Sequence, residues 1–513
     1  MLNRLLQLRQ TFIAVRQHQG YFYRNLAIAI LTNGIVSVVG VEQAIAVPCQ
    51  LPAAAIQQKE NLRQAAIRGN RTAQNRYREL LSQHARQLTA CRQRNWPRNQ
   101  AIWLRLYPCD IRPGSLERIM DRIVNKGYNQ VYVEVFADSK VLLPQADNPT
   151  PWQSVVKVQG AQRVDLLAQA IQKGRQRGLK VYAWLYTMNF GSAYAQRPDR
   201  RGTLARNGFG HDNLSALYDV AVDEDLLRRE NGKAFIDPYS PQARQDYQKL
   251  VQAVIKRRPD GVLFDYVRYP RSGGGASVAA RVQDLWIYGD ASLRTLYRRS
   301  FNNKGLALIY QFLSQGYITA GDIAEIDALN PEEGEPLWQG RNPNTTKYLT
   351  LPQQRQPILQ QQLWLLTVTH AVQGILEFLQ VGIRPVQQQR IRAGAVFFPS
   401  GNRAVGQGYD SRIQPWDQFP SNIEWHPMLY KACRNTSCIV GEMREVLSFA
   451  QRRTEIKPAL AGVWGKSISN RPSLEAQMQA IRQFAPRITT VSHFAFSWQE
   501  PGLDRERKFC QMR

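Results

Sequence analysis

Short apolar segments alternate with amphipathic segments along the chain from residue 101 onward. Apolar runs of strand length lie at 101–107, 129–136, 180–188, 261–267, 393–398, 422–430, 456–464 and 489–498. Helical periodicity predicts helices between them at 116–126, 164–176, 241–257, 360–380, 440–452 and 473–484. Eight strands with interleaved helices predict an α/β fold of the (β/α)8 TIM barrel class.

Two segments interrupt this alternation. Residues 271–355 follow the fourth strand, contain Gly- and Pro-rich stretches, and are expected to form an insertion at the barrel rim. Residues 53–94 have apolar positions at loose helical spacing with a break at Gly69-Asn70, which predicts a helical hairpin or one broken helix. We therefore expect a basic helical segment over 47–99 and a barrel with its insertion over 100–513.

The first 46 residues have the pattern of an export signal. A basic start without acidic residues precedes a largely apolar run at 26–41, and Ala44-Ile-Ala46 offers a cleavage site. An uncleaved N-terminal anchor is the alternative. Export to the periplasm or the extracellular space argues against a nucleic-acid partner and limits membrane contact to this signal or anchor.

The charge balance indicates attraction to a polyanion. The formal net charge is +27, and residues 53–98 hold ten Lys and Arg against two Glu. That segment is either a solvated helical face packed on the main domain or an electrostatic contact to an anionic envelope surface. In an exported chain, the expected partner is a polysaccharide of the envelope or the exterior, neutral or anionic. The sequence leaves the oligomeric state open.

All six cysteines lie beyond the expected cleavage point, which suggests disulfides. Cys433 and Cys438 could close a small loop, and Cys49 and Cys91 flank the helical segment. The remaining pair, Cys109 and Cys510, follows the first and last strands, which are neighbours in a barrel. The chain has no Cys-x2-Cys motif and no His at ligand spacing, so neither a metal nor a cofactor is expected.

The fourth expected strand carries the leading catalytic candidate. Asp265 lies near the C-terminal end of the run from Asp260-Gly to Pro270, and that end of a barrel strand is where catalytic residues sit. A helix-capping Asp is the alternative. Arg268 could keep Asp265 ionised or bind an acidic sugar, or it could be an ordinary surface arginine.

Strand alternation assigns inward-facing side chains to the neighbouring strands. The second strand would turn Tyr132, Glu134 and Phe136 inward, and an inward Glu is costly unless it is paired or functional. The third strand would turn inward three aromatic residues: Tyr182, which we expect to be core, and Trp184 and Tyr186, which could stack on sugars.

The ends of the later strands supply further candidates. A last strand that runs to Trp498 would bring Trp498 and Glu500 to the rim. Glu424 lies six residues before Tyr430, roughly 20 Å of strand, and is expected at the opposite, stability face. The seventh strand ends at Trp464 without a carboxylate, which disfavours a nucleophile from that strand.

Several motifs together resemble the family-10-like glycosyl hydrolase group. They are NQVYVEVF at 129–136 with Pro149-x-Pro-Trp152, the segment from Asp165-Leu-Leu to Tyr-Ala-Trp184, the segment from Phe235-Ile-Asp237 to Pro270, and His426-Pro-Met-x-Tyr430. The resemblance covers about residues 100–500 and implies a TIM barrel that acts on a polysaccharide, with Asp265 as the catalytic candidate. Many members have a second acid after that Asp, whereas this chain has Tyr266. A second carboxylate would then come from Glu134, Asp138, Asp110 or Glu500.

The expected function is an exported glycoside hydrolase with two-carboxylate catalysis. Asp265 would act as nucleophile or base, and Glu134 or Glu500 as proton donor. The candidate substrate-binding residues are Trp184, Tyr186, Arg268, Tyr430, Trp464, Trp498 and Asp138. The alternatives are a non-catalytic glycan-binding barrel and an envelope scaffold protein that uses its basic helices.

Overall fold

The computed structural model describes residues 49–219, 232–272 and 277–511. In this part of the chain, eight parallel strands form a closed barrel in the order β1-β2-β5-β6-β8-β11-β13-β14, with β14 pairing back to β1. The strands are β1 (Asn99–Leu104), β2 (Gln130–Ala137), β5 (Lys180–Tyr186), β6 (Gly261–Asp265), β8 (Arg392–Phe397), β11 (Glu424–Leu429), β13 (Ala459–Ala461) and β14 (Thr490–Phe494). The expected TIM barrel is confirmed. The expected export signal at 1–46 lies outside the described residues.

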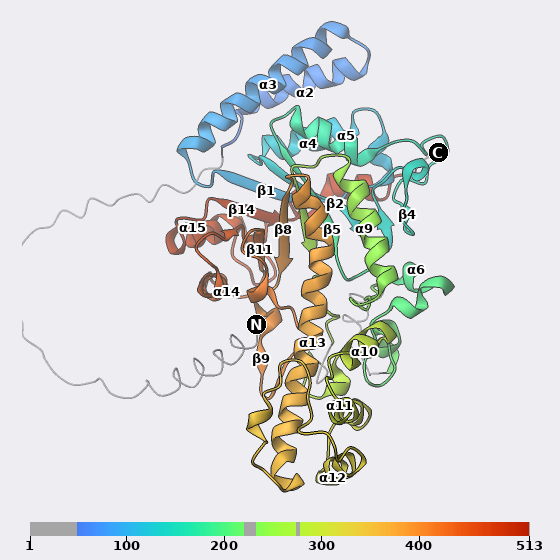
Figure 1. The fold of residues 1–513 in the computed structure, drawn as a ribbon. Coiled ribbons are helices and arrows are strands. Elements are labelled where there is room, and N and C mark those ends of the chain that lie inside the picture. The colour runs from blue at the N-terminus through green and yellow to red at the C-terminus, as the bar shows by residue number, and fades with distance from the viewer. Residues whose placement is uncertain (1–48, 220–231, 273–276, 512–513) are drawn as a thin grey trace, which may run out of the picture.

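Helices cover the outside of the barrel (Figure 1). They include α4 (Ser115–Asn125), α5 (Leu166–Arg175), α9 (Pro241–Ile255), α13 (Pro352–Gln388), α14 (Ser437–Phe449), α15 (Leu474–Phe484) and α17 (Pro501–Lys508). Short elements lie in the connections: α6 (Ser192–Ala195), α7 (Asn213–Asp219), α16 (Phe496–Gln499), β3 (Lys140–Val141), β4 (Gln153–Ser154) and β12 (Glu455–Ile456). Most helices begin at a side-chain or proline cap, such as Asp165 before α5 and Ser240 before α9.

The C-terminal part of helix α13 packs on the barrel, where Gly382 lies against Phe264 of β6. The helix spans 37 residues and is the one helix in the described ranges that has the length and hydropathy of a membrane span, yet 61% of its apolar window is buried. A Cβ on Gly382 would lie 2.5 Å from the Phe264 ring, so a glycine is needed where α13 approaches β6. This burial against β6 identifies α13 as a core helix of the fold.

Aromatic side chains fill the barrel interior. The rings of Trp103, Tyr132, Tyr182 and His426 pack on one another with centroid distances from 4.9 to 5.6 Å. The Tyr182 hydroxyl donates to Glu424 over 3.2 Å, at the end of the barrel where the strands begin. Tyr182 is therefore core, as expected.

Ion pairs around Glu424 close the end of the barrel where the strands begin. This first residue of β11 pairs with Arg392 at 3.0 Å and with Lys457 at 2.6 Å, and it accepts a hydrogen bond from His426. These partners hold the pKa of Glu424 well below its usual range against the opposing effect of burial. Glu424 lies at the stability face, as its position six residues before Tyr430 predicts.

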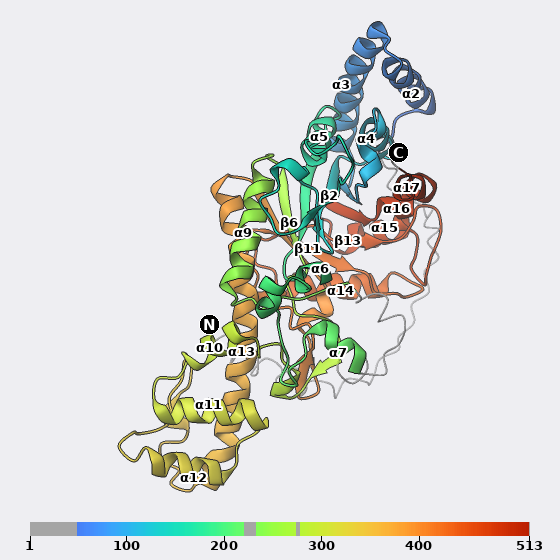
Figure 2. The same ribbon diagram turned by 90° about the vertical axis from the view of Figure 1, so that its right-hand side faces the viewer.

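A helical extension leaves the barrel after β6. It contains α10 (Asp290–Tyr297), α11 (Asn303–Gln315) and α12 (Ala320–Leu329) and returns along α13. A small antiparallel sheet joins β7 (Val278–Ala279), which follows β6, to β10 (Gly408–Asp410) and β9 (Ala404–Val405), which follow β8. In both views, α11 and α12 lie at the end of the molecule opposite the N-terminal helices (Figures 1 and 2).

Two helices precede the barrel and form a hairpin. They are α2 (Ala53–Ile67) and α3 (Arg71–Arg94), joined at Gly69 and Asn70, where Asn70 caps α3 by accepting the amide of Ala73. Tyr77, Leu81 and Leu88 of α3 are buried, which gives the hairpin an apolar face toward the barrel.

All three expected disulfides are present. They join Cys49 to Cys91, Cys109 to Cys510 and Cys433 to Cys438, with Cα–Cα distances of 5.9, 6.4 and 6.3 Å. The second bond ties the segment after β1 to the segment after α17, because β1 and β14 are neighbours in the closed barrel.

Two expectations about strand geometry are wrong. The last strand ends at Phe494 rather than Trp498, and residues 496–499 form the short helix α16. The register between β2 and β5 shifts after Glu134, so Val135 is an extra residue and Phe136 faces outward against Trp152. The alternating apolar pattern shows neither the bulge nor the strand end, since aromatic residues continue past both.

Candidate active site

Asp265 ends β6 at the mouth of the barrel, the end at which the C-termini of the eight strands meet. Its Oδ1 accepts the amide of Tyr266 over 2.7 Å, and its Oδ2 accepts the indole Nε1–H of Trp184 over 3.1 Å. Asp265 is level with Tyr186 on β5 and shares the inward face of β6 with Leu263. Both carboxylate oxygens are therefore held by donors from the strand ends.

Burial changes the acidity of this carboxyl group. Asp265 is 7% exposed, and desolvation raises its pKa to about 6, although Tyr266, Trp184 and Arg268 favour the ionised form. A carboxyl with this pKa exchanges its proton near neutral pH, which suits acid–base chemistry.

A chain of aromatic contacts starts at Trp184, the residue that donates to Asp265. Trp184 packs against Tyr186 at 5.7 Å and against Phe494 at 6.4 Å, and Phe494 in turn lies 5.8 Å from Tyr430 and 6.4 Å from Trp498. These rings come from β5, from β14 with α16, and from the residue after β11. The mouth is therefore lined by rings of the kind that stack on sugar faces.

Tyr266 directly follows Asp265 at the end of β6. Its φ of 54° lies in the left-handed region, which is uncommon for a bulky residue. Its ring lies 4.3 Å from Tyr186, with the Arg268 guanidinium at 4.7 Å and the Lys233 ammonium at 5.4 Å. Two cationic side chains thus lie near the Tyr266 ring at the end of β6. Arg268 is buried and lowers the pKa of Asp265, so it is not an ordinary surface arginine.

Glu134 of β2 is paired with an arginine. The guanidinium of Arg105, directly after β1, donates to both Glu134 oxygens over 2.6 Å. Burial raises the pKa of Glu134, and Arg105 opposes that rise. The Glu134 side chain is 11% exposed and the Arg105 side chain 47%, so the pair is reached by solvent from the arginine side.

Three carboxylates share one neighbour. Burial raises the pKa of Tyr186 well above its usual range, and Glu134, Asp138 and Asp265 all add to the rise. Asp138 is exposed in the turn after β2 and also raises the pKa of Glu134. Glu134 is level with Trp184 and Asp265 with Tyr186, two residues further along β5. Glu134, Asp138 and Asp265 thus gather around the end of β5.

Two other candidate acids lie elsewhere. Glu500 begins α17 and forms an ion pair of 3.1 Å with Lys126 at the end of α4, in the helical layer. It does not join the Asp265 group, because β14 ends six residues before it. Asp110 is buried and bonded to Arg507 through both oxygens, over 2.8 and 2.7 Å, next to the Cys109 disulfide.

The remaining binding candidates separate into two places. Tyr430 is half-buried at the mouth, and its hydroxyl has no hydrogen-bond partner among the described residues. Trp464 lies beyond the end of β13, donates to the Tyr128 hydroxyl over 3.2 Å and packs on His493. Trp464 thus contacts Tyr128 and His493 and not the residues around Asp265.

Sequence reasoning missed three residues of this site. Arg105 directly follows the first strand, Phe494 ends the last strand, and Lys233 lies in the long connection before α9. Arg105 and Phe494 could have been found, since both occupy the rim position that drew attention to Asp265. Lys233 has no comparable signal. Among the described residues, no group of three or more His, Cys, Asp or Glu is placed to hold a metal ion.

Part of the barrel matches a known family model. Residues 112–284 match the family model described as glycosyl hydrolase-like 10. The matched segment covers less than half of the chain and includes Glu134, Trp184 and Asp265. No curated protein gives a significant match.

Solved glycosidase structures resemble the fold distantly. A GH18 chitinase from Pseudoalteromonas aurantia has 9% identity and a TM-score of 0.34, over 79% of this chain and 98% of that chain. A β-N-acetylhexosaminidase from Bacteroides fragilis has 10% identity and a TM-score of 0.37, over 81% of this chain and 65% of that chain. Similarities this distant carry no argument about the site.

Proposed function

We propose that this chain is an exported glycoside hydrolase whose catalytic centre is Asp265 at the barrel mouth. The observation that carries the proposal is the buried Asp265 carboxyl, held by Trp184 within the segment that matches the glycosyl hydrolase-like family. Burial raises the pKa of Asp265 to about 6, which places its ionised form within reach of neutral pH.

The proposed chemistry uses two carboxyl groups. Ionised Asp265 accepts the proton of an attacking water or attacks the anomeric carbon itself, and Glu134 protonates the leaving oxygen. The pKa of Glu134 is raised by burial, as a proton donor requires. Arg105 opposes this rise in pKa, because its two hydrogen bonds to Glu134 favour the ionised carboxylate. We assign Asp138, exposed beside Glu134, to substrate contact and not to proton transfer.

The proposed substrate is a polysaccharide, and its sugars would stack on the mouth rings. Tyr430 and Trp498 are half-buried and would offer their rings to the sugars, whereas Trp184 and Tyr186 are buried beside Asp265. Arg268 and Lys233 near Tyr266 favour a sugar with an acidic group. Trp464 and Glu500 take no part in this proposal.

The disulfides are consistent with an exported protein, because such bonds form and persist in oxidising compartments. We propose a periplasmic or extracellular location, reached through the export signal at 1–46.

A specific observation favours a second candidate, a glycan-binding barrel without catalysis. Tyr266 stands where many relatives carry their second acid, and Glu134 is already neutralised by Arg105. Such a protein would keep the aromatic mouth and bind polysaccharide without cleaving it.

A paired assay separates the two candidates. Wild-type protein is incubated with peptidoglycan, with neutral polysaccharides and with acidic polysaccharides, and both binding and release of new reducing ends are measured. Hydrolysis of at least one polymer that stops in Asp265→Asn supports the enzyme. Binding without release, unaffected by Asp265→Asn, supports the glycan-binding barrel.

A further inference from the structure

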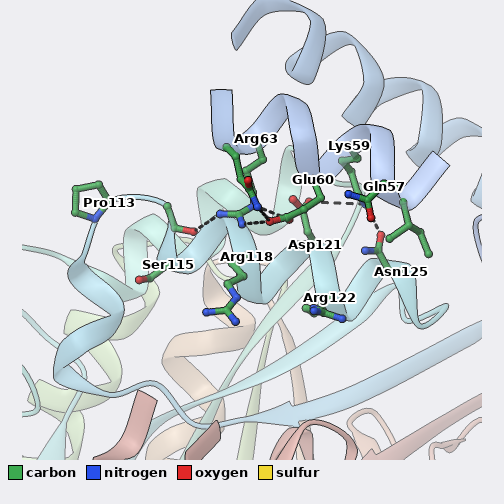
Figure 3. A pocket seen from close by; sticks show the side chains of 13 residues that line it. Gln57, Lys59, Glu60, Arg63, Pro113, Ser115, Arg118, Asp121, Arg122 and Asn125 are labelled. Atoms are coloured by element: carbon green, nitrogen blue, oxygen red, sulfur yellow. Dashed lines mark hydrogen bonds and ion pairs between the residues drawn. The ribbon is translucent and has the colours of Figure 1, made fainter. Parts of the chain in front are cut away.

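A polar cavity lies between α2 of the N-terminal hairpin and α4 on the barrel, and no residue of the Asp265 group lines it (Figure 3). Its volume is about 550 Å³, with α2 on one side and α4 on the other. Four cationic side chains line it: Lys59 and Arg63 from α2, and Arg118 and Arg122 from α4. A cavity of this size admits a sugar-sized anionic group.

The two acidic residues that line the cavity are already occupied. Glu60 accepts hydrogen bonds from Arg63 over 3.0 and 2.5 Å. Asp121 accepts the Tyr77 hydroxyl over 2.6 Å and the Arg177 guanidinium over 2.8 Å, both deep in the hairpin–barrel junction. Lys59 and Arg63 are themselves partners of these acids, with Lys59 3.8 Å from Asp121, so Arg118 and Arg122 of α4 supply the excess positive charge of the lining.

The cationic wall on α4 has room to bind. Arg122 is exposed, and the Arg118 side chain is 40% exposed with Glu506 as its partner at 3.0 Å. The two arginines are one helical turn apart and so face the same side of α4. The start of α4, at Gly114 and Ser115, forms one end of the cavity and adds the positive end of the helix dipole.

The outer surface of the hairpin continues the positive charge. Among the described residues of this segment, Glu79 is the one exposed acid, against seven exposed arginines: Arg68, Arg71, Arg76, Arg78, Arg86, Arg94 and Arg98. A polyanion that places one group in the cavity would meet further cations along the hairpin.

The hairpin is held rigidly on the barrel. The Cys49–Cys91 disulfide ties its two ends, and Arg92 donates to the carbonyls of Gly127 and Tyr128 over 3.0 and 3.2 Å. The Trp96 indole donates to the carbonyl of Ile488 over 2.7 Å. The walls of the cavity are thus fixed before any ligand binds, which lowers the entropic cost of binding.

We propose that this cavity, the hairpin cleft, binds a carboxylate or phosphate group of an anionic polysaccharide, and that it is a second glycan site separate from the mouth. Arg118 and Arg122 hold the anionic group, and the exposed arginines of the hairpin attract the rest of the polymer. The site would keep a long acidic chain attached to the enzyme while another part of it reaches Asp265. Binding in the cleft does not depend on hydrolysis.

The test measures binding of defined polymers to the full mature chain by calorimetry. The probes are polygalacturonate for carboxylates, polyphosphate for phosphates, neutral dextran, and vesicles of phosphatidylglycerol with phosphatidylcholine. The cleft variant is Arg118→Gln with Arg122→Gln. The matched control, Arg452→Gln with Arg453→Gln, removes the same charge from an exposed turn after α14, outside the hairpin. Arg122→Gln alone serves if the double variant has a lowered Tm.

The expected result is binding of polygalacturonate or polyphosphate that weakens about tenfold or more in the cleft variant, since charge-assisted hydrogen bonds are lost. The control variant would weaken it far less, and dextran would not bind. Equal weakening in both variants would show diffuse surface charge and overturn the proposal. So would unchanged binding in the cleft variant, absence of polymer binding, or cleft-dependent binding to the vesicles alone.

Discussion

The indole Nε1–H of Trp184 donates a hydrogen bond of 3.1 Å to Oδ2 of Asp265. Trp184 lies on β5 and Asp265 ends β6, so the contact depends on the register of two neighbouring strands. The bond favours the ionised carboxylate and opposes the desolvation that raises the pKa of Asp265 to about 6. Trp184 therefore lowers the pKa of the proposed catalytic carboxyl while its ring packs at the end of β5.

Trp184→Phe keeps the ring and removes the donor. We expect the pKa of Asp265 to rise further, by on the order of one unit, because the ionised form loses a hydrogen bond. Carboxyl NMR titration of Asp265 measures this shift without a substrate. Trp498→Phe is the control, since Trp498 contacts Phe494 rather than the carboxyl. An unchanged Asp265 pKa in Trp184→Phe would contradict the role assigned to this bond.

The raised pKa of Asp265 makes folding stability depend on pH. The folded pKa of about 6 lies above the ordinary value of 3.8, so ionisation of Asp265 destabilises the folded state. This destabilisation is absent below about pH 4 and complete above about pH 6. The unfolding free energy of Asp265→Asn, relative to wild type, should improve by up to about 3 kcal/mol between pH 4 and pH 7. Denaturant unfolding at several pH values measures it. A difference that stays constant with pH would rule out the raised pKa.

The Arg105–Glu134 pair gives a prediction of similar form. Arg105→Ala leaves a buried carboxylate without its partner, so the pKa of Glu134 should rise above its already raised value. We expect a loss of about 1–2 kcal/mol at pH 7, moderated by the exposure of Arg105, and a smaller loss at pH 4, where Glu134 is more protonated. Arg105→Lys should recover part of the loss, because it keeps the positive charge. The recovery is incomplete, since an ammonium cannot form the bidentate contact.

Arg86→Ala is the control for this prediction, as Arg86 is exposed on α3. Equal losses in Arg105→Ala and Arg86→Ala would mean that the pair contributes nothing to holding Glu134.

The disulfides differ in the length of chain that they enclose. Cys109 and Cys510 are 401 residues apart, whereas Cys433 and Cys438 are 5 apart. Replacing Cys109 and Cys510 by serine should cost about 2–5 kcal/mol and expose α17 to proteolysis. The same change at Cys433 and Cys438 should cost much less, because a short loop loses little entropy in the unfolded chain. Tm values of the two variants test this, and a larger loss in the second would contradict it.

The barrel and its cross-links were predictable from the sequence. Strand and helix periods differ, so eight alternations identify the fold, and ring closure brings the first and last strands together, which explains the Cys109–Cys510 bond. Strand parity likewise placed Trp184 on the inward face, where it meets Asp265.

The pattern could not show where strands end or bulge. Phe494, Phe496 and Trp498 alternate as in a strand, yet the chain turns into α16 after Phe494 and carries Glu500 into the helical layer. The bulge after Glu134 likewise turns Phe136 outward. These details depend on tertiary packing.

The partner of Glu134 was also beyond the sequence. Arg105 and Glu134 are 29 residues apart and meet because β1 and β2 are paired in register. A charged residue after a strand is common, and only the barrel geometry shows which carboxylate it reaches.

The most direct test of the central claim is the release of reducing ends by wild type and Asp265→Asn from a polysaccharide that both bind. If Asp265 is catalytic, wild type turns the polymer over and the variant loses about 10²–10⁴-fold of that rate while it retains its affinity for the polymer. Equal turnover by the two proteins would contradict the account and remove Asp265 from the mechanism.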